Sequence, residues 1–246
     1  MPKSLFNAEQ KLEFAAVLNK FKNLYLATEQ IHKKNEENPH ANGAHAFEHD
    51  LAVAAFAHAI GRQYSRRLAE TSVAAALMHS YDRHPKSDQS RETFSEENVR
   101  SWIRDYLAML TADEQSAVLD AVVLHDKPNK GKVVEVPTTS DVLADADKLA
   151  NVMLYSVLRL GQYSSRKPPV RIGNLNGRTP GATYRNFNVV MDDVFSRFDW
   201  LDDPSWFVTK EAKQIAASLD RPWRSFVETV KKQFEDIGLA EMPIVE

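Results

Sequence analysis

Apolar residues recur at helical spacing along nearly the whole chain, and β-branched runs bounded by turn residues are rare. This pattern predicts an all-α protein. Helices are expected over residues 8–32, 44–64, 68–81, 96–110, 112–125 and 141–160, with two or three closing helices over 184–238. Asn7, Thr111 and Ser140 are the expected N-caps of three of them. The helix over 44–64 is rich in Ala, which favours a buried central position.

The chain shows no internal repeat, low-complexity tract or linker, so residues 1–246 are predicted to form a single all-α domain. Residues 161–183 contain four of the eight glycines and three of the eleven prolines. That composition predicts a long loop, and long loops in compact domains are often functional.

Composition excludes several classes of protein. The chain has no Cys, which rules out disulfide scaffolds, thiolate zinc sites and cysteine nucleophiles. Its longest apolar run is seven residues, over 51–57, far short of the roughly 20 that span a bilayer. No membrane partner is expected. Because no apolar signal region opens the chain, we expect a cytoplasmic protein.

Four polar side chains interrupt apolar helix faces: His49, His79, His125 and Asp147. Burying such groups without partners is costly. A nearby hydroxyl or carbonyl could satisfy each one separately, which would make them ordinary core residues. Four of them on successive helices also fit a shared metal site, because imidazole nitrogens and a carboxylate are suitable ligands for a divalent ion.

Three segments resemble the motifs of the HD-domain superfamily of metal-dependent phosphohydrolases. Residues 48–54 resemble its first His motif, and residues 74–79 the apolar approach to its second. Residues 146–151 resemble its final Asp motif, in the form found in the (p)ppGpp hydrolase branch. The resemblance covers about residues 44–155 and implies an HD-domain helical bundle, here with a C-terminal helical extension over about 184–238.

The resemblance implies that His49, His79 and Asp147 bind a divalent ion, one of Mn, Fe, Ni, Co, Mg or Zn. His79 takes the central position, because His125 lies only 22 residues before Asp147 and leaves too little chain for the intervening helices. His125 then resembles the additional histidine that lines the pocket in some branches.

The chain departs from the family after His79, where Ser80 replaces the motif's metal-binding Asp. Asp82 lies three residues after His79 and would share its face if the helix extends that far. Asp82 is therefore a candidate fourth ligand and, together with His125, a candidate proton acceptor. The alternative for Asp82 is a turn residue paired with Arg83.

The remaining His and Asp candidates are not expected to bind the metal. His32, His40 and His58 show no partner pattern and are expected to be solvated. Asp145 is assigned to the surroundings of the site or to solvent, because Asp147 fits the motif.

Basic residues are concentrated in one part of the chain. Residues 148–191 contain seven Lys and Arg and no Asp or Glu, although the whole chain has a net charge of −3. The candidate phosphate-binding residues are Arg83, Lys148, Arg166, Lys167, Arg171 and Arg178. The alternative is an exposed basic loop without a ligand. No aromatic residue lies between 166 and 178, which argues against a nucleic-acid platform.

These features together predict a metal-dependent phosphohydrolase acting on a small phosphorylated substrate, with a nucleotide as the expected class. Ser80 prompts an alternative, a degenerate HD fold that binds a nucleotide or a partner without hydrolysis. A metal-dependent redox enzyme on the same scaffold is a third possible function. The sequence does not define the oligomeric state, and a dimer is one of the states that it allows.

Overall fold

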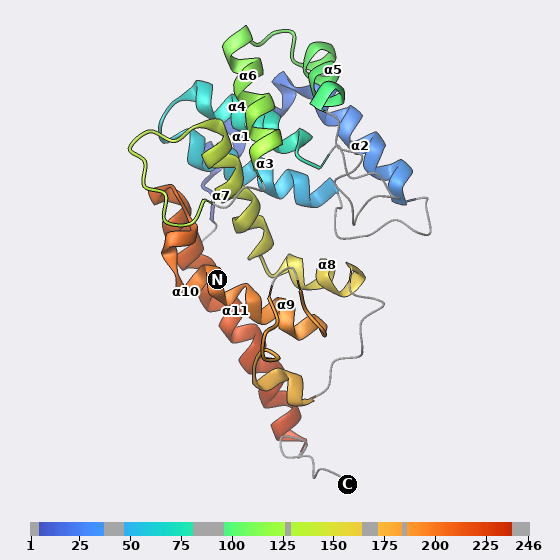
Figure 1. Ribbon diagram of the computed structural model, residues 1–246, viewed down its shortest axis with the longest axis vertical. Helices are drawn as coiled ribbons and strands as arrows, with labels where there is room; N and C mark the ends of the chain where they lie inside the picture. The colour runs from blue at the N-terminus through green and yellow to red at the C-terminus, as the bar shows by residue number, and fades with distance from the viewer. Residues whose placement is uncertain are drawn as a thin grey trace. The chain divides into compact units, whose positions relative to one another are not determined.

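The computed structural model describes residues 5–36, 47–80, 96–125, 129–163, 172–183 and 186–237. Within these ranges the regular elements are helices, and the only β pairing is an isolated bridge between Thr183 and Asn186. The predicted all-α class is confirmed (Figure 1). No described helix combines the length and the apolar character needed to cross a membrane.

Contacts divide the chain into two compact units. Unit 1 comprises Met1–Ala150 and Ser205–Ile215, and unit 2 comprises Asn151–Pro204 and Ala216–Glu246. The long helix α11, Lys210–Asp236, contributes residues to both units. The single all-α domain expected from the sequence stays a prediction, and the two units are subdivisions within the chain.

The helices of unit 1 are α1 (Ala8–Lys20), α2 (Lys22–Glu36), α3 (Phe47–Gly61), α4 (Arg66–Met78), α5 (Glu96–Tyr106), α6 (Ala112–Leu124) and α7 (Thr139–Asn151), which ends at the unit boundary. Helix α3 is buried along most of its length, as its Ala content predicted, and it packs most extensively against α4. Gly61 permits their close approach, because a Cβ there would lie 2.7 Å from the Ala69 Cα. These two helices carry His49 and lead to His79.

Helix starts follow the predicted caps in two of three cases. Asn7 forms a capping box with Gln10, and Thr111 forms one with Glu114. The third helix begins two residues earlier than expected. Thr138 and Asp141 exchange the capping hydrogen bonds there, at 3.3 and 3.0 Å, so Ser140 lies inside α7.

Two expected helices are each divided. Residues 8–32 form α1 and part of α2, which meet at Phe21. The helix expected over 141–160 ends at Asn151, and α8 (Tyr155–Tyr163) follows. The Val152 carbonyl accepts a hydrogen bond from the Trp223 indole, which supplies a tertiary partner where the helix stops. That partner lies 71 residues away in sequence, so local periodicity does not reveal it.

The elements assigned to unit 2 are α8, a 3₁₀ turn over Ile172–Asn176, α9 (Val190–Ser196), α10 (Phe198–Asp202) and the rest of α11. A second 3₁₀ turn, Pro204–Trp206, lies at the boundary. The predicted loop over 161–183 thus begins with the last residues of α8 and contains the first 3₁₀ turn. Its residues 164–171 lie outside the described ranges.

Candidate metal centre

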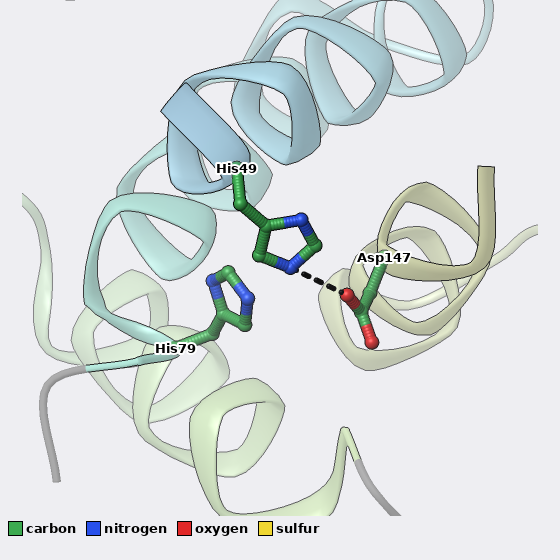
Figure 2. Close-up of side chains that lie close together, drawn as sticks. All are labelled: His49, His79 and Asp147. Atoms are coloured by element: carbon green, nitrogen blue, oxygen red, sulfur yellow. Dashed lines mark ion pairs between the residues drawn. The ribbon is translucent and has the colours of Figure 1, made fainter. Parts of the chain in front are cut away.

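His49 and Asp147 come from different helices of unit 1 and lie in contact. His49 lies in the first turn of α3 and is 4% exposed, whereas Asp147 lies on α7. The His49 Nε2 atom is 3.0 Å from the Asp147 Oδ1 atom (Figure 2). Two helices about 100 residues apart in sequence thus bring an imidazole and a carboxylate into contact.

His79 is the third member of the cluster and the C-cap of α4. Its Nδ1 atom lies 2.6 Å from the Ala76 carbonyl oxygen. Since a carbonyl can only accept, Nδ1 carries the hydrogen, and Nε2 of the neutral ring keeps its lone pair. The ring centre lies 5.4 Å from that of His49 (Figure 2).

Together these three side chains offer a compact donor set. One ligand atom each from His49, His79 and Asp147 lies within 4.8 Å of the others. Two nitrogens and one carboxylate oxygen suit borderline divalent ions such as Zn, Fe, Ni, Co and Mn better than Mg or Ca, which favour oxygen. The predicted three residues therefore meet in space, and their chemistry fits a divalent metal.

Electrostatics keeps the carboxylate of the cluster ionised. Burial would raise the pKa of the Asp147 carboxyl, but the hydrogen bond from His49 and the charges of nearby imidazoles hold it well below its usual range. The group is thus an anion at neutral pH, the form that binds a cation.

His125 lies beside the cluster. It is the C-cap of α6, and its ring centre lies 5.6 Å from that of His79. Its Nδ1 atom is 2.7 Å from the Val122 carbonyl oxygen, so its Nε2 atom is the proton-accepting nitrogen of the neutral ring. The predicted place of His125 near the metal residues fits this geometry.

A buried carboxylate that the sequence analysis did not single out lies next to His49. Asp50 is fully buried, and its two oxygens bond at 2.8 Å to Ser80 Oγ and to His32 Nε2. Burial raises the pKa of Asp50, yet the charge of His79 and the His32 hydrogen bond outweigh it and lower the pKa. The expectation that His32 is solvated is wrong, because it is 5% exposed. The signal in the sequence is an Asp directly before an apolar run.

Two further expectations need correction. His58, expected in solvent, is buried on α3 and packs against the Phe14 ring. Asp145 is fully buried rather than solvated, and it accepts hydrogen bonds from the Val208 and Thr209 backbones and the Thr209 hydroxyl. It therefore ties α7 to the start of α11. His40 lies outside the described residues.

Asp82 and Arg83 lie outside the described residues as well. Helix α4 ends at Met78, however, and His79 is its C-cap. The helical spacing that was expected to put Asp82 on the face of His79 therefore stops before Asp82. Its roles as ligand and proton acceptor stay predictions without that support.

The candidate phosphate-binding residues are only partly described. The Lys148 ammonium bonds to Asn129 Oδ1 at 2.8 Å and to the Ala144 carbonyl, and burial lowers its pKa. In unit 2, the Arg178 guanidinium pairs with Asp199 at 2.6 Å. The others, Arg166, Lys167 and Arg171, lie outside the described residues. A role in phosphate binding stays a prediction for all of them.

Solved structures with this fold include two that cover most of this chain. A Lactobacillus plantarum protein, solved as a structural-genomics target, has a TM-score of 0.60 and 15% identity, over 89% of this chain and 98% of that one. Bacillus subtilis YpgQ, solved in complex with ADP, has a TM-score of 0.51 and 14% identity, over 87% of this chain and 100% of that one. No protein-family model and no curated protein matches the chain. At these identities the likeness shows a shared fold alone.

Proposed function

We propose that this chain is a metal-dependent phosphohydrolase of the HD-domain superfamily, acting on a small phosphorylated compound, with a nucleotide as the class. The observation that carries the proposal is the meeting of His49, His79 and Asp147 within 4.8 Å. These are the three positions at which the sequence resembles the family's motifs. The ADP bound by YpgQ, a protein of the same fold, supports a nucleotide as the ligand class.

The chain's own residues have distinct tasks in this reaction. His49, His79 and Asp147 would hold one divalent ion, which when bound would lower the pKa of a water and polarise a phosphoryl oxygen. His125 can accept the proton of the attacking water at Nε2, because its Nδ1 hydrogen is held by Val122. The oxygen of that water then joins phosphorus as the bond to the leaving oxygen breaks.

Binding without hydrolysis is the second candidate, favoured by Ser80. This residue is a buried hydroxyl at the position where the family motif has a carboxylate, and it donates its hydrogen to Asp50. A protein of this kind would hold a nucleotide and release no phosphate.

Phosphate release separates the two candidates. We would measure inorganic phosphate from nucleoside mono-, di- and triphosphates with metal-free protein and after adding Mn²⁺, Co²⁺ or Ni²⁺. Release is expected only with metal, and Asp147→Asn should abolish it. The matched control is Asp141→Asn, a buried carboxylate on the same helix that bonds to Lys132 and Thr138 instead. Nucleotide binding with no release under any metal would favour the second candidate.

A further inference from the structure

Asp50 is a fully buried carboxylate adjacent to the metal cluster, and both of its oxygens are occupied. Ser80 Oγ donates to Oδ1 at 2.8 Å, and His32 Nε2 bonds to Oδ2 at 2.8 Å. We call these three residues the Asp50 network. They come from three separate segments, with His32 on α2, Asp50 on α3 and Ser80 two residues after α4.

Packing alone does not account for this network. Removing an ionised carboxylate from water costs several kcal/mol, and apolar residues of similar volume are often at least as stable in its place. One turn further along α3, Val53 and Ala54 are fully buried apolar residues. A carboxylate retained there with two partners calls for a role that an apolar side chain cannot take.

The network reaches one ligand of the proposed metal site. Asp50 Oδ1 lies 3.7 Å from His79 Nδ1, and Ser80 Oγ lies 3.4 Å from His79 Nε2. The carboxylate and the hydroxyl that it holds thus lie near both nitrogens of one imidazole. By contrast, Asp50 contributes no atom to the three-residue donor set.

The Asp50 carboxylate also changes the net charge around the proposed metal site. Two neutral imidazoles and one carboxylate leave a divalent ion with a net charge of +1 in a largely buried site. A fixed anion 3.7 Å from His79 Nδ1 offsets part of that charge. The Nδ1 hydrogen goes to the Ala76 carbonyl, so Asp50 acts on this imidazole through its charge. Partners of this kind around metal ligands typically change metal affinity by about 10–100-fold.

We propose that Asp50 is a positioning residue, which holds the Ser80 hydroxyl beside His79 and supplies the second negative charge of the metal site from a neighbouring helix. His32 provides the matching partner on the far oxygen of the carboxylate. This inference rests on the proposed function, because it assumes that His79 binds a metal.

Mn²⁺ titration of the full chain tests the inference. Asp50→Asn keeps the side-chain shape and removes the charge, and it should weaken Mn²⁺ binding by about 10–100-fold. The matched control is Glu70→Gln, a buried carboxylate on α4 that bonds to Lys20 and Arg66. Glu70→Gln should lower thermal stability and leave the Mn²⁺ affinity unchanged.

A second variant keeps the inference falsifiable if Asp50→Asn does not fold. Ser80→Ala leaves the carboxylate in place and removes the hydroxyl that donates to Asp50 Oδ1. It should weaken Mn²⁺ binding by less than Asp50→Asn does, because the charge beside His79 remains.

The outcomes separate the inference from the proposed function. If wild-type protein binds Mn²⁺ and both Asp50→Asn and Ser80→Ala bind it equally well, the inference is overturned and the metal site stands. If wild-type protein binds no divalent ion, the proposed function fails first.

Discussion

His79 and His125 share one local geometry. Each follows the last residue of its helix and directs Nδ1 to the carbonyl oxygen three residues earlier, at 2.6 and 2.7 Å. Helix ends leave such carbonyls without intrahelical partners, so the two rings satisfy them and become fixed in one tautomer. The Nε2 atoms are thereby set for a metal or a proton before any ligand arrives.

Removing any one of the three proposed ligands should abolish metal binding. His49→Ala, His79→Ala and Asp147→Ala should each abolish Mn²⁺ binding by calorimetric titration while the far-UV spectrum stays helical, because each removes a ligand. His58→Ala is the matched control. It removes a buried histidine from the same helix as His49 and should cost stability without affecting the metal. Unchanged binding in two of the three ligand variants would contradict the assignment.

The stability of the metal-free protein should depend on pH through His58. Burial, followed by the charge of Arg62, lowers the pKa of His58 below its usual value of about 6.5. The unfolded chain therefore binds more protons below pH 7, and the free energy of unfolding falls as the pH drops through 6.5 towards the folded pKa. Each unit of pKa difference contributes at most about 1.4 kcal/mol.

Urea unfolding at pH 7.5 and 5.5, in the presence of a chelator, measures this contribution. His58→Gln cannot titrate, so its loss of stability between the two pH values should be smaller than that of wild-type protein. Equal losses in the two proteins would show that His58 is not held in its neutral form.

The three metal-site residues could be predicted because each lies on an otherwise apolar helix face. The partnership of His32 with Asp50 could not, because His32 shows no such contrast in its own polar helix. For Asp145 the sequence left two environments open, the surroundings of the site or solvent, and the structure excludes solvent. Its partners, the Val208 and Thr209 backbones and the Thr209 hydroxyl, lie more than 60 residues away, so the local pattern does not reveal them.

At the scale of elements, the close approach of α3 and α4 fixes the two segments that carry His49 and His79. Gly61→Ala should destabilise the protein by about 1–3 kcal/mol, because the added Cβ meets backbone atoms of Ala69 that cannot move aside cheaply. Gly173→Ala is the control, since a Cβ there meets nothing within 4 Å. Chemical denaturation compares them, and equal stabilities would contradict the close approach.

Helix starts were more predictable than helix ends. Asn7 and Thr111 cap their helices through residues three positions away, a pattern visible in the sequence. The break after Asn151 instead coincides with the Trp223 hydrogen bond to Val152, and the periodicity on either side is uninterrupted. Local signals thus define the start of these two helices, whereas a tertiary contact accompanies the end of α7.

At the scale of the whole molecule, charge is segregated along the chain. Residues 148–191 carry +7, and the net charge of −3 leaves −10 for the rest. If the basic residues bind phosphate, replacing Arg166, Lys167, Arg171 and Arg178 with Gln should raise KM for a nucleotide substrate roughly tenfold, equivalent to about 1.4 kcal/mol. The salt dependence of KM should flatten with it.

The control for this prediction removes the same charge elsewhere. Gln at the exposed positions Lys11, Lys22, Lys33 and Arg104 should leave KM and its salt dependence nearly unchanged. If both sets of substitutions act alike, the basic segment has no local role and only the net charge matters.

Elemental analysis of wild-type protein, purified without added metal alongside His79→Ala, determines whether this chain holds a metal ion at His49, His79 and Asp147. We expect one divalent transition ion per wild-type chain and a large loss of it in the variant, because His79 is one of the three donors. A wild-type chain without metal that also fails to take up Mn²⁺, Co²⁺ or Ni²⁺, or a variant that retains the full content, would contradict this expectation.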